Sequence, residues 1–279
     1  MRDFPRSARS PLVILLASLL LAACNRDGTT PAPAAPPPVA PPATAPGDAG
    51  PVALNDVIET TPRYIVGISY PEHAAAYPPL ARALQAYAEA ARGELMRAVG
   101  GLGGTRPPAP YDLSLQFSMV AETPRVVAVA ADGSSYTGGA HGLPLVERFV
   151  WLPQMQQMLA AEQLIPDAAN WQPVSAYVRE QLMTALSQQL DDDGLEGEVH
   201  ASQLELRSRM IADGTAPSPA NFARFEPVMN ADGSIRALRF VFPPYQVAPY
   251  VEGTRTVDVP ARVLVPLVAP AYKPLFRAG

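Results

Sequence analysis

The sequence predicts an α+β fold in which antiparallel sheets pack with helices and form two abutting subdomains. Segments with helical periodicity and segments with strand periodicity occur in separate blocks, which favours α+β over α/β architectures. Residues 111–119 alternate between apolar and polar side chains, as in an antiparallel strand that is buried on one face. Residues 230–233 read Asn-Ala-Asp-Gly between two apolar segments, which is a strong signal for a β-hairpin.

The first block is expected at residues 57–152. Residues 64–70 are β-branched and aromatic, as strands are. Pro78 and Pro79 then open a helix with apolar residues at every third or fourth position, and a Gly-Gly pair at 100–101 ends it. Further strands are expected at 111–119, 126–131 and 145–152, with a loop over 132–142.

The second block is expected at residues 153–279. Helical periodicity covers residues 154–164, 173–190 and 202–211. Asp-Asp-Asp-Gly at 191–194 ends the longest of these helices. Strands are expected at 222–229 and 235–242, which flank the hairpin turn, and at 254–259, which precedes a tail broken by prolines.

The N-terminus has the order of an export signal. Three arginines precede a short apolar run at 12–21, and Leu21-Ala22-Ala23 precedes Cys24, the only cysteine of the chain. This order resembles the lipobox of bacterial lipoproteins, which implies removal of residues 1–23 and acylation of Cys24. The alternative is a membrane anchor with an incidental cysteine, although the apolar run is short for a bilayer about 30 Å thick. Asn25 follows Cys24, and in many Gram-negative lipoproteins this implies sorting to the outer membrane, facing the periplasm.

Residues 24–56 are expected to form a tether between the lipid and the folded chain. Nine prolines fall between Thr29 and Pro51, and most of the other residues there are alanine or threonine. Such a composition buries no core and favours extended polyproline conformations. We therefore expect the folded part to stand away from the membrane surface.

Composition disfavours several classes of function. Without residues 1–23 the chain keeps 18 basic and 25 acidic residues, a net charge of −7, which disfavours nucleic acids and favours a basic partner. Lys273 is the only lysine, and the P-loop and serine–lysine motifs are absent. The three histidines fit no zinc spacing, and residues 191–198 lack the spacing of a calcium loop. We expect no catalytic residue, no cofactor and no metal, and hence a protein that is not an enzyme.

Two short segments are candidates for binding. Segment 136–142 places three glycines beside a single histidine, and segment 245–253 carries two tyrosines on a turn bounded by proline and glycine. Glycines let a backbone approach other groups closely, and tyrosines are enriched at binding hot spots. We expect the two segments to lie near one another. The expected partner-binding residues are Tyr136, Thr137, Gly138, Gly139, His141, Tyr245 and Tyr250. The alternative is that both segments are buried determinants of the fold.

Residues 136–141 read Tyr-Thr-Gly-Gly-Ala-His, and they resemble the YTGGAH signature of a family of bacterial surface domains of unknown function. The order of later motifs is also similar, with Pro-Tyr-Gln at 244–246, Tyr-x-x-Gly at 250–253 and a strand that ends at Pro260. The resemblance covers residues 63–267. This family includes the extracellular domain of RsiV-type lysozyme-sensing anti-sigma factors and the N-terminal region of PdaC-type peptidoglycan deacetylases. The chain lacks the Asp-Asp and His-x-x-x-His metal pattern of the deacetylases.

The resemblance implies an envelope lipoprotein whose domain captures or inhibits a lysozyme-type muramidase or a similar basic envelope protein. Two alternatives stay open at this point. The chain could assist an enzyme that acts on peptidoglycan, or it could be a structural envelope lipoprotein in which the glycine motif only supports the fold.

Overall fold

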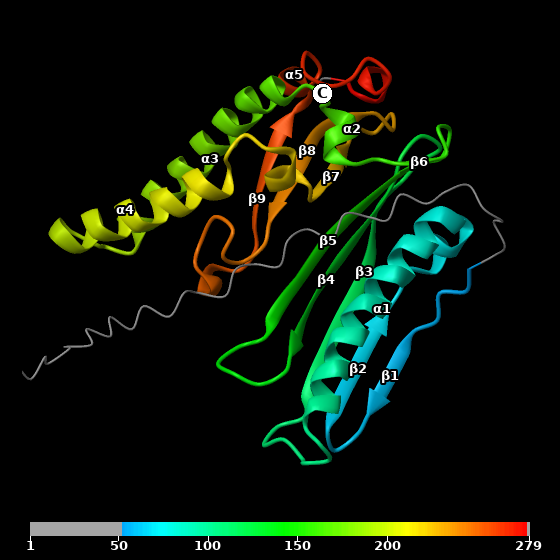
Figure 1. Ribbon diagram of the computed structural model, residues 1–279. Coiled ribbons are helices and arrows are strands. Elements are labelled where there is room, and N and C mark those ends of the chain that lie inside the picture. Colours follow the sequence, from blue (N-terminus) through cyan, green and yellow to red (C-terminus); the bar gives the residue numbers. More distant parts are fainter. Residues whose placement is uncertain (1–51, 278–279) are drawn as a thin grey trace, which may run out of the picture. The chain divides into compact units, whose positions relative to one another are not determined.

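The computed structural model of the chain describes residues 52–277 (Figure 1). The export signal, Cys24 and nearly all of the expected tether lie outside this range. Among the described residues, no helix is both long enough and apolar enough to cross a membrane. The described chain forms two open β-sheets that pack with helices, and the predicted α+β class is confirmed.

Six strands form the first sheet, in chain order. They are β1 (Val57–Thr60), β2 (Tyr64–Ser69), β3 (Tyr111–Glu122), β4 (Val127–Tyr136), β5 (Leu143–Leu152) and β6 (Gln157–Met158). All neighbours pair antiparallel except β2 and β3, which are parallel because helix α1 (Pro78–Gly101) carries the chain back between them. The strand predicted at 111–119 is therefore antiparallel to β4 and parallel to β2.

Helix α1 covers one face of this sheet (Figure 1). A short 3-10 helix, η1 (Glu72–Ala76), precedes α1. Pro78 and Pro79 occupy the first positions of α1, where a missing N–H costs no hydrogen bond. The predicted apolar stripe is confirmed, since Leu80, Leu84 and Leu95 are fully buried in a core with the apolar face of β3. We call the opposite face, which α1 does not cover, the outer face of the sheet.

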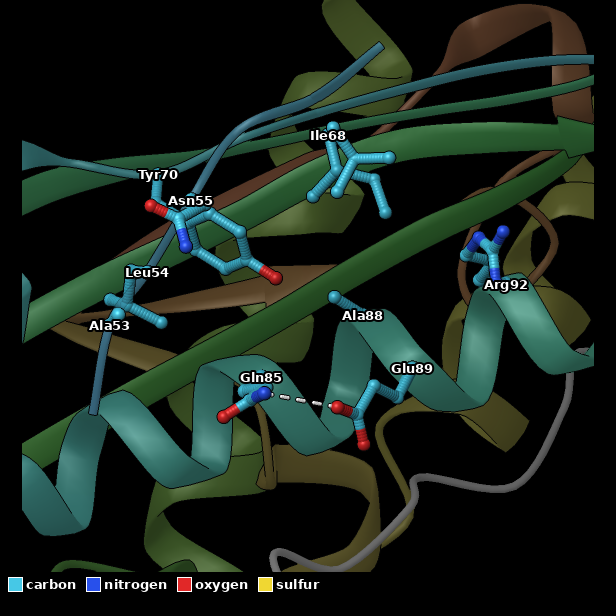
Figure 2. A pocket seen from close by; sticks show the side chains of 10 residues that line it. Ala53, Leu54, Asn55, Ile68, Tyr70, Gln85, Ala88, Glu89 and Arg92 are labelled. Carbon is cyan, nitrogen blue, oxygen red and sulfur yellow. Dashed lines mark hydrogen bonds between the residues drawn. The ribbon is translucent and has the colours of Figure 1, made fainter. Parts of the chain in front are cut away.

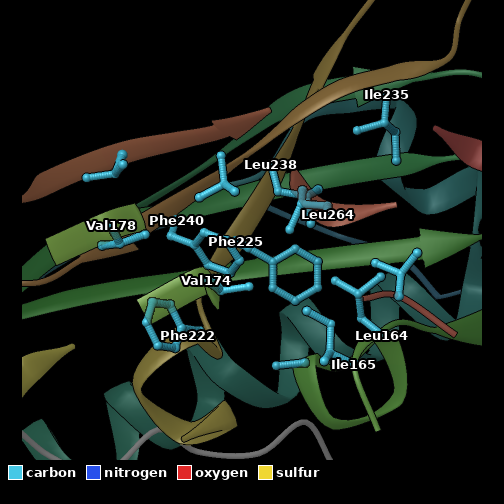
Figure 3. Close-up of a cluster of buried hydrophobic side chains, with 14 of the residues drawn as sticks. Leu164, Ile165, Val174, Val178, Phe222, Phe225, Ile235, Leu238, Phe240 and Leu264 are labelled. Carbon is cyan, nitrogen blue, oxygen red and sulfur yellow. The ribbon is translucent and has the colours of Figure 1, made fainter. Parts of the chain in front are cut away.

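Three antiparallel strands form the second sheet, namely β7 (Phe225–Met229), β8 (Ile235–Phe242) and β9 (Arg255–Pro260). The predicted hairpin is confirmed, because β7 and β8 flank the turn at 230–233. The helices of this half are α2 (Ala161–Leu164), α3 (Trp171–Asp192), α4 (Gly197–Gly214) and α5 (Ala261–Leu264), with 3-10 helices η2 (Ala168–Asn170), η3 (Pro219–Phe222), η4 (Tyr250–Glu252) and η5 (Lys273–Leu275). Trp171, Phe222 and Phe240 pack at ring-centroid distances of 5.2–6.5 Å in the core that α3 shares with this sheet. Figure 3 shows Phe222 and Phe240 in this core.

Some boundaries differ from the sequence prediction. The prediction missed β1, and β4 continues to Tyr136 through much of the loop expected at 132–142, because β4 pairs with both β3 and β5 there. Position 133 of this strand requires glycine, because a Cβ there would lie 2.0 Å from the carbonyl oxygen of Ser114 on β3. The helix predicted at 154–164 is wrong over its first part. A turn and β6 replace it, since the chain pairs again with the end of β5, and only α2 is helical.

Strand β4 marks the place where the first sheet becomes covered on both faces. Val127, Val129 and Ala131 belong to the core under α1, whereas Ala128 belongs to the core shared with the second sheet. From Asp132 to the end of β4, every residue is at least partly exposed. Strand β7 packs on β3, β4 and β5. The second sheet therefore covers only part of the outer face.

A chain of alternating charges joins the two sheets at this boundary. The guanidinium of Arg148 on β5 lies 3.0 Å from the carboxylate of Asp132 on β4 and 2.7 Å from that of Glu226 on β7. Arg239 on β8 lies 3.7 Å from Glu226 and forms two hydrogen bonds, of 2.7 and 3.0 Å, with Asp258 on β9. The side chains of Arg148 and Glu226 are only 8% and 12% exposed. Buried charges of this kind are stable only when they are paired.

Replacing Arg148→Met should therefore destabilise the protein strongly, because the largely buried carboxylate of Glu226 loses its nearest cation. We expect a loss of about 3 kcal/mol in the free energy of unfolding, at the lower end for a broken buried pair because Arg239 still faces Glu226. Urea denaturation measures this loss. The matched control is Arg97→Met, which removes an exposed pair with Glu94 and should change stability by less than about 0.5 kcal/mol. Equally small changes in both variants would contradict a structural role for Arg148.

Candidate functional site

The two segments singled out in the sequence are in direct contact. The hydroxyl of Tyr245 lies 2.8 Å from Nε2 of His141. The rings of His141 and Tyr250 stack with a centroid distance of 4.1 Å and an interplanar angle of 18°, and the rings of Tyr245 and Tyr250 lie 5.6 Å apart. We call these three residues the aromatic cluster. The expected proximity of the two segments is confirmed, whereas their part in binding stays a prediction.

The hydrogen bonds of His141 fix its tautomer when the ring is neutral. Nδ1 lies 3.2 Å from the carbonyl oxygen of Gly142, and because a carbonyl only accepts, Nδ1 must carry the proton. Nε2 then accepts from the hydroxyl of Tyr245. The imidazole is thus held at both nitrogens, and its exposed ring face is presented in one orientation.

Glycines shape the loop that carries His141. Gly138 and Gly139 have φ of +99° and +102°, which a residue with a side chain rarely adopts. The hydroxyl of Tyr136 donates to the carbonyl of Gly139 at 3.3 Å, so Tyr136 supports the loop from the end of β4. Thr137 is exposed at the start of the loop. Of the predicted residues in this segment, His141 therefore meets the second segment, while Tyr136, Gly138 and Gly139 determine the shape of the loop.

The turn that carries Tyr245 is fixed at its start by the side chain of Gln246. Its amide nitrogen donates to the carbonyl of Gly214 at the end of α4 (3.0 Å) and to the carbonyl of Asn221 in η3 (2.9 Å). The turn approaches α4 so closely that a Cβ on Gly214 would lie 2.0 Å from the carbonyl oxygen of Gln246. Tyr245 itself has φ of +74°, a strained value for a residue other than glycine.

The end of the same turn is fixed by a buried ion cluster. Glu252 in η4 pairs with Arg207 on α4 and with Arg255 on β9, and its side chain is 11% exposed. Gln189 on α3 accepts a hydrogen bond from each of these arginines, at 3.1 and 2.9 Å. The turn is therefore attached to both long helices and to the second sheet. Because its backbone is held in this way, Tyr250 is presented with little freedom to move.

Two apolar side chains that the sequence analysis did not select lie beside the aromatic cluster. Val251, next to Tyr250, is 89% exposed, and Leu143, two residues after His141, is 45% exposed. Exposed apolar groups that gather beside aromatic rings are typical of interaction sites. The signal in the sequence was available, since both residues are large apolar residues adjacent to the glycine-rich and tyrosine-rich segments.

Glu147 and His73 are two other polar residues of the described chain that have structural partners. The carboxylate of Glu147 accepts the N–H of Arg148 at the free edge of β5 and faces Arg224, while burial raises its pKa. Nδ1 of His73 lies 3.2 Å from the carboxylate of Glu122. Hydrogen bonds from His73 and Tyr77 lower the pKa of Glu122 below its usual value. No group of three or more histidine, cysteine or acidic residues suited to a metal occurs among residues 52–277.

A small pocket lies between β2, α1 and the residues that lead into β1 (Figure 2). It has a volume of about 170 Å³ and is lined mainly by apolar groups, with Tyr70, Glu89 and Arg92 among the polar ones. Glu89 accepts a hydrogen bond from Gln85 at 3.0 Å. Burial, and to a smaller extent the nearby carboxylate of Glu89, raises the pKa of Tyr70. The pocket contains none of the predicted binding residues.

Part of the second half of the chain is similar to a known protein family. Residues 164–262 match the DUF3298 family, described as a protein of unknown function. The match includes Tyr245 and Tyr250 but not His141. No curated protein is significantly similar to the chain in sequence.

One solved structure extends the likeness in fold beyond residues 164–262. A DUF3298 family protein from Pseudomonas aeruginosa PAO1 is 15% identical, with a TM-score of 0.50 and coverage of 83% of this chain and 99% of that protein. A member of the family from Bacteroides fragilis NCTC 9343 is 13% identical, with a TM-score of 0.47 and coverage of 78% and 93%. At such identities the likeness concerns the fold alone.

Replacing Gly214→Ala tests how firmly the turn at 245–253 is attached. The new methyl group would meet the backbone of Gln246, so α4 and the turn must separate and both hydrogen bonds of the Gln246 amide are strained. We expect a loss of about 2–3 kcal/mol in the free energy of unfolding. Gly93→Ala in the interior of α1, where nothing lies within 4 Å, should instead stabilise the protein by about 0.5–1 kcal/mol. Denaturation curves that move in the same direction for both variants would contradict the close approach.

Proposed function

We propose that this chain is a lipid-anchored envelope protein whose domain captures a lysozyme-type peptidoglycan hydrolase, or a similar basic protein, through the aromatic cluster. The observation that carries this proposal is the juxtaposition of His141, Tyr245 and Tyr250 from two distant segments, beside the exposed Val251. Further support comes from the resemblance of the two segments to the lysozyme-sensing surface domains.

The aromatic cluster has the properties that favour a protein contact. Tyrosine offers a large contact area for a small loss of side-chain entropy. The backbone on both sides of Tyr250 is already fixed by Gln246 and Glu252, so binding would order few additional groups. Burial of Val251 and Leu143 by a partner would add apolar area that is in water in the free protein.

Charge also supports a basic partner. The chain from Cys24 onward carries a net charge of −7. Five acidic residues fall within 191–198, at the junction of α3 and α4, and all of them are exposed. An acidic surface accelerates the encounter with a basic protein, and this acceleration decreases as salt screens the charges. Lysozyme-type hydrolases are typically basic.

Two other functions would give different results in the same assays. A domain that assists or performs peptidoglycan chemistry would change the cleavage or deacetylation of peptidoglycan in a zymogram, and the change would depend on a single acidic residue. A structural lipoprotein would bind no muramidase, and its His141 and Tyr250 variants would lose stability instead of binding. We favour capture because the described residues offer a partly exposed aromatic cluster and no metal-ligand group.

Replacing His141→Ala or Tyr250→Ala should weaken capture of a basic lysozyme by on the order of 1–2 kcal/mol, or roughly 5- to 30-fold in Kd. The melting temperature should stay nearly unchanged, because neither side chain belongs to a hydrophobic core. Titration calorimetry and thermal unfolding measure the two effects. His73→Ala is the matched control. This exposed histidine pairs with Glu122 at the C-terminal end of β3, and the variant should bind the lysozyme normally. A large fall in melting temperature without a specific loss of binding would assign the cluster to folding.

The lipid anchor is tested at the N-terminus of the protein extracted from membranes. We expect mass spectrometry to find Cys24 as the first residue, with acyl groups on its thiol and amino group. Cys24→Ser should release the protein from the membrane fraction, since the acyl chains provide the hydrophobic contact with the bilayer. An intact Met1 or an unmodified Cys24 would contradict the lipoprotein assignment. Recovery in the inner-membrane fraction would contradict only the sorting to the outer membrane.

A further inference from the structure

Among residues 52–277, the outer face of the first sheet is exposed over β1, β2 and the part of β3 that β7 does not contact. Along β3, a strand with neighbours on both sides, Ser114, Gln116, Ser118 and Val120 are all exposed. Ile58 on β1 is 86% exposed, and Ile65 on β2 is also exposed. A sheet face that is open to water is normally polar, so two exposed isoleucines on it are unusual.

The register of the strands connects these isoleucines to the aromatic cluster. One row across the outer face contains Thr60, Ile65, Asp112 and Tyr136, each opposite the next. The adjacent row contains Ile58, Gly67, Ser114, Ser134 and Pro144. With strands about 4.8 Å apart, the rows extend roughly 15–20 Å from β1 to the strand that leads into the loop of His141.

Gly67 leaves this part of the surface without a side chain. No atom lies within 4 Å of the position that its Cβ would occupy, and Ile58 lies directly opposite on β1. This open space leaves room for a side chain of a partner between the aliphatic group of Ile58 and the hydroxyl group of Ser114. The two rows and the aromatic cluster together form what we call the platform.

Asp112 is the one acidic residue of these two rows, and no ion pair or hydrogen bond of its carboxylate occurs among residues 52–277. Burial raises the pKa of this carboxyl group, and no nearby cation offsets the effect. Ionised Asp112 therefore costs free energy in the unbound protein. A cation from a partner would relieve this cost, and the flanking Tyr136 ring could stack on the same cation.

We infer that the contact surface for a basic protein extends from the aromatic cluster across the platform to β1, with a lysine or arginine of that protein facing Asp112 between Ile65 and Tyr136. This inference rests on the proposed function and adds the position of the partner and its recognition chemistry. A surface that combines one uncompensated carboxylate with exposed isoleucines complements a cation surrounded by apolar groups. We propose a basic protein and not a second copy as the occupant, because another acidic copy would bring no excess of positive charge.

The test uses the mature chain and a basic lysozyme as the probe, in titration calorimetry at two salt concentrations. Asp112→Asn should weaken binding about 10-fold and make affinity less dependent on salt, because one charge pair is lost. Its melting temperature should stay equal or rise, since a partly buried carboxylate without a partner is removed. Ile65→Ser should weaken binding several-fold through lost apolar contact. Glu72→Gln is the control, because it removes an exposed carboxylate in η1, outside the platform, and should bind normally.

Each outcome decides between the two proposals. If His141→Ala weakens binding while Asp112→Asn and Ile65→Ser do not, the platform inference is overturned and the proposed function stands. If the wild-type chain does not bind the lysozyme, both are overturned. A fall in melting temperature that parallels lost binding in Asp112→Asn would assign Asp112 to folding and also overturn the inference. Self-association that Ile58→Ser abolishes, with unchanged affinity for the lysozyme, would identify the face as an interface between copies.

Discussion

The arrangement of this domain depends on one constraint, which is that the first sheet is buried on both faces over only part of its area. Residues 127–131 of β4 are apolar without interruption, and all of them are buried. A strand of this kind needs cover on both sides. Helix α1 covers one side, and the second sheet covers the other only where this run lies. Beyond Ala131 the strand becomes polar on its outer face, so the cover ends and the face stays open to water.

The boundary between covered and open sheet determines where charges and aromatic residues lie. Arg148 and Asp132 stand at this boundary, where a guanidinium can contact Glu226 of the second sheet and still reach the open side. The same position of the second sheet brings the turn after β8 to the end of β4. His141 and Tyr245, which are 104 residues apart in sequence, can therefore share a hydrogen bond. The aromatic cluster is thus a consequence of partial cover and is not produced by either segment alone.

Local patterns predicted most elements of this fold, because long periodic segments contain their own signal. The stripe of α1, the alternation of β3 and the hairpin at 230–233 were all visible in the sequence. The errors occurred where pairing overrides local preference. Asp132 and Gly133 look like turn residues, but β3 and β5 hold them in a strand. The parallel pairing of β2 and β3, the ion cluster around Glu252 and the partners of Gln246 depend on contacts across the chain, and no local pattern contains them.

Several departures from local rules gather around the aromatic cluster and the platform. Tyr245 adopts a positive φ, which costs a residue with a side chain about 1–2 kcal/mol. Val251 exposes most of its surface, and Asp112 has no cation within contact distance among the described residues. None of these features stabilises the free domain, whereas the buried charges of Arg148 and Glu226 are paired and the apolar stripe of α1 is buried. Proteins tolerate such unfavourable contributions to stability at sites that serve a function. Under the proposed function, a partner that covers Val251 and supplies a cation to Asp112 would offset both unfavourable contributions through one contact.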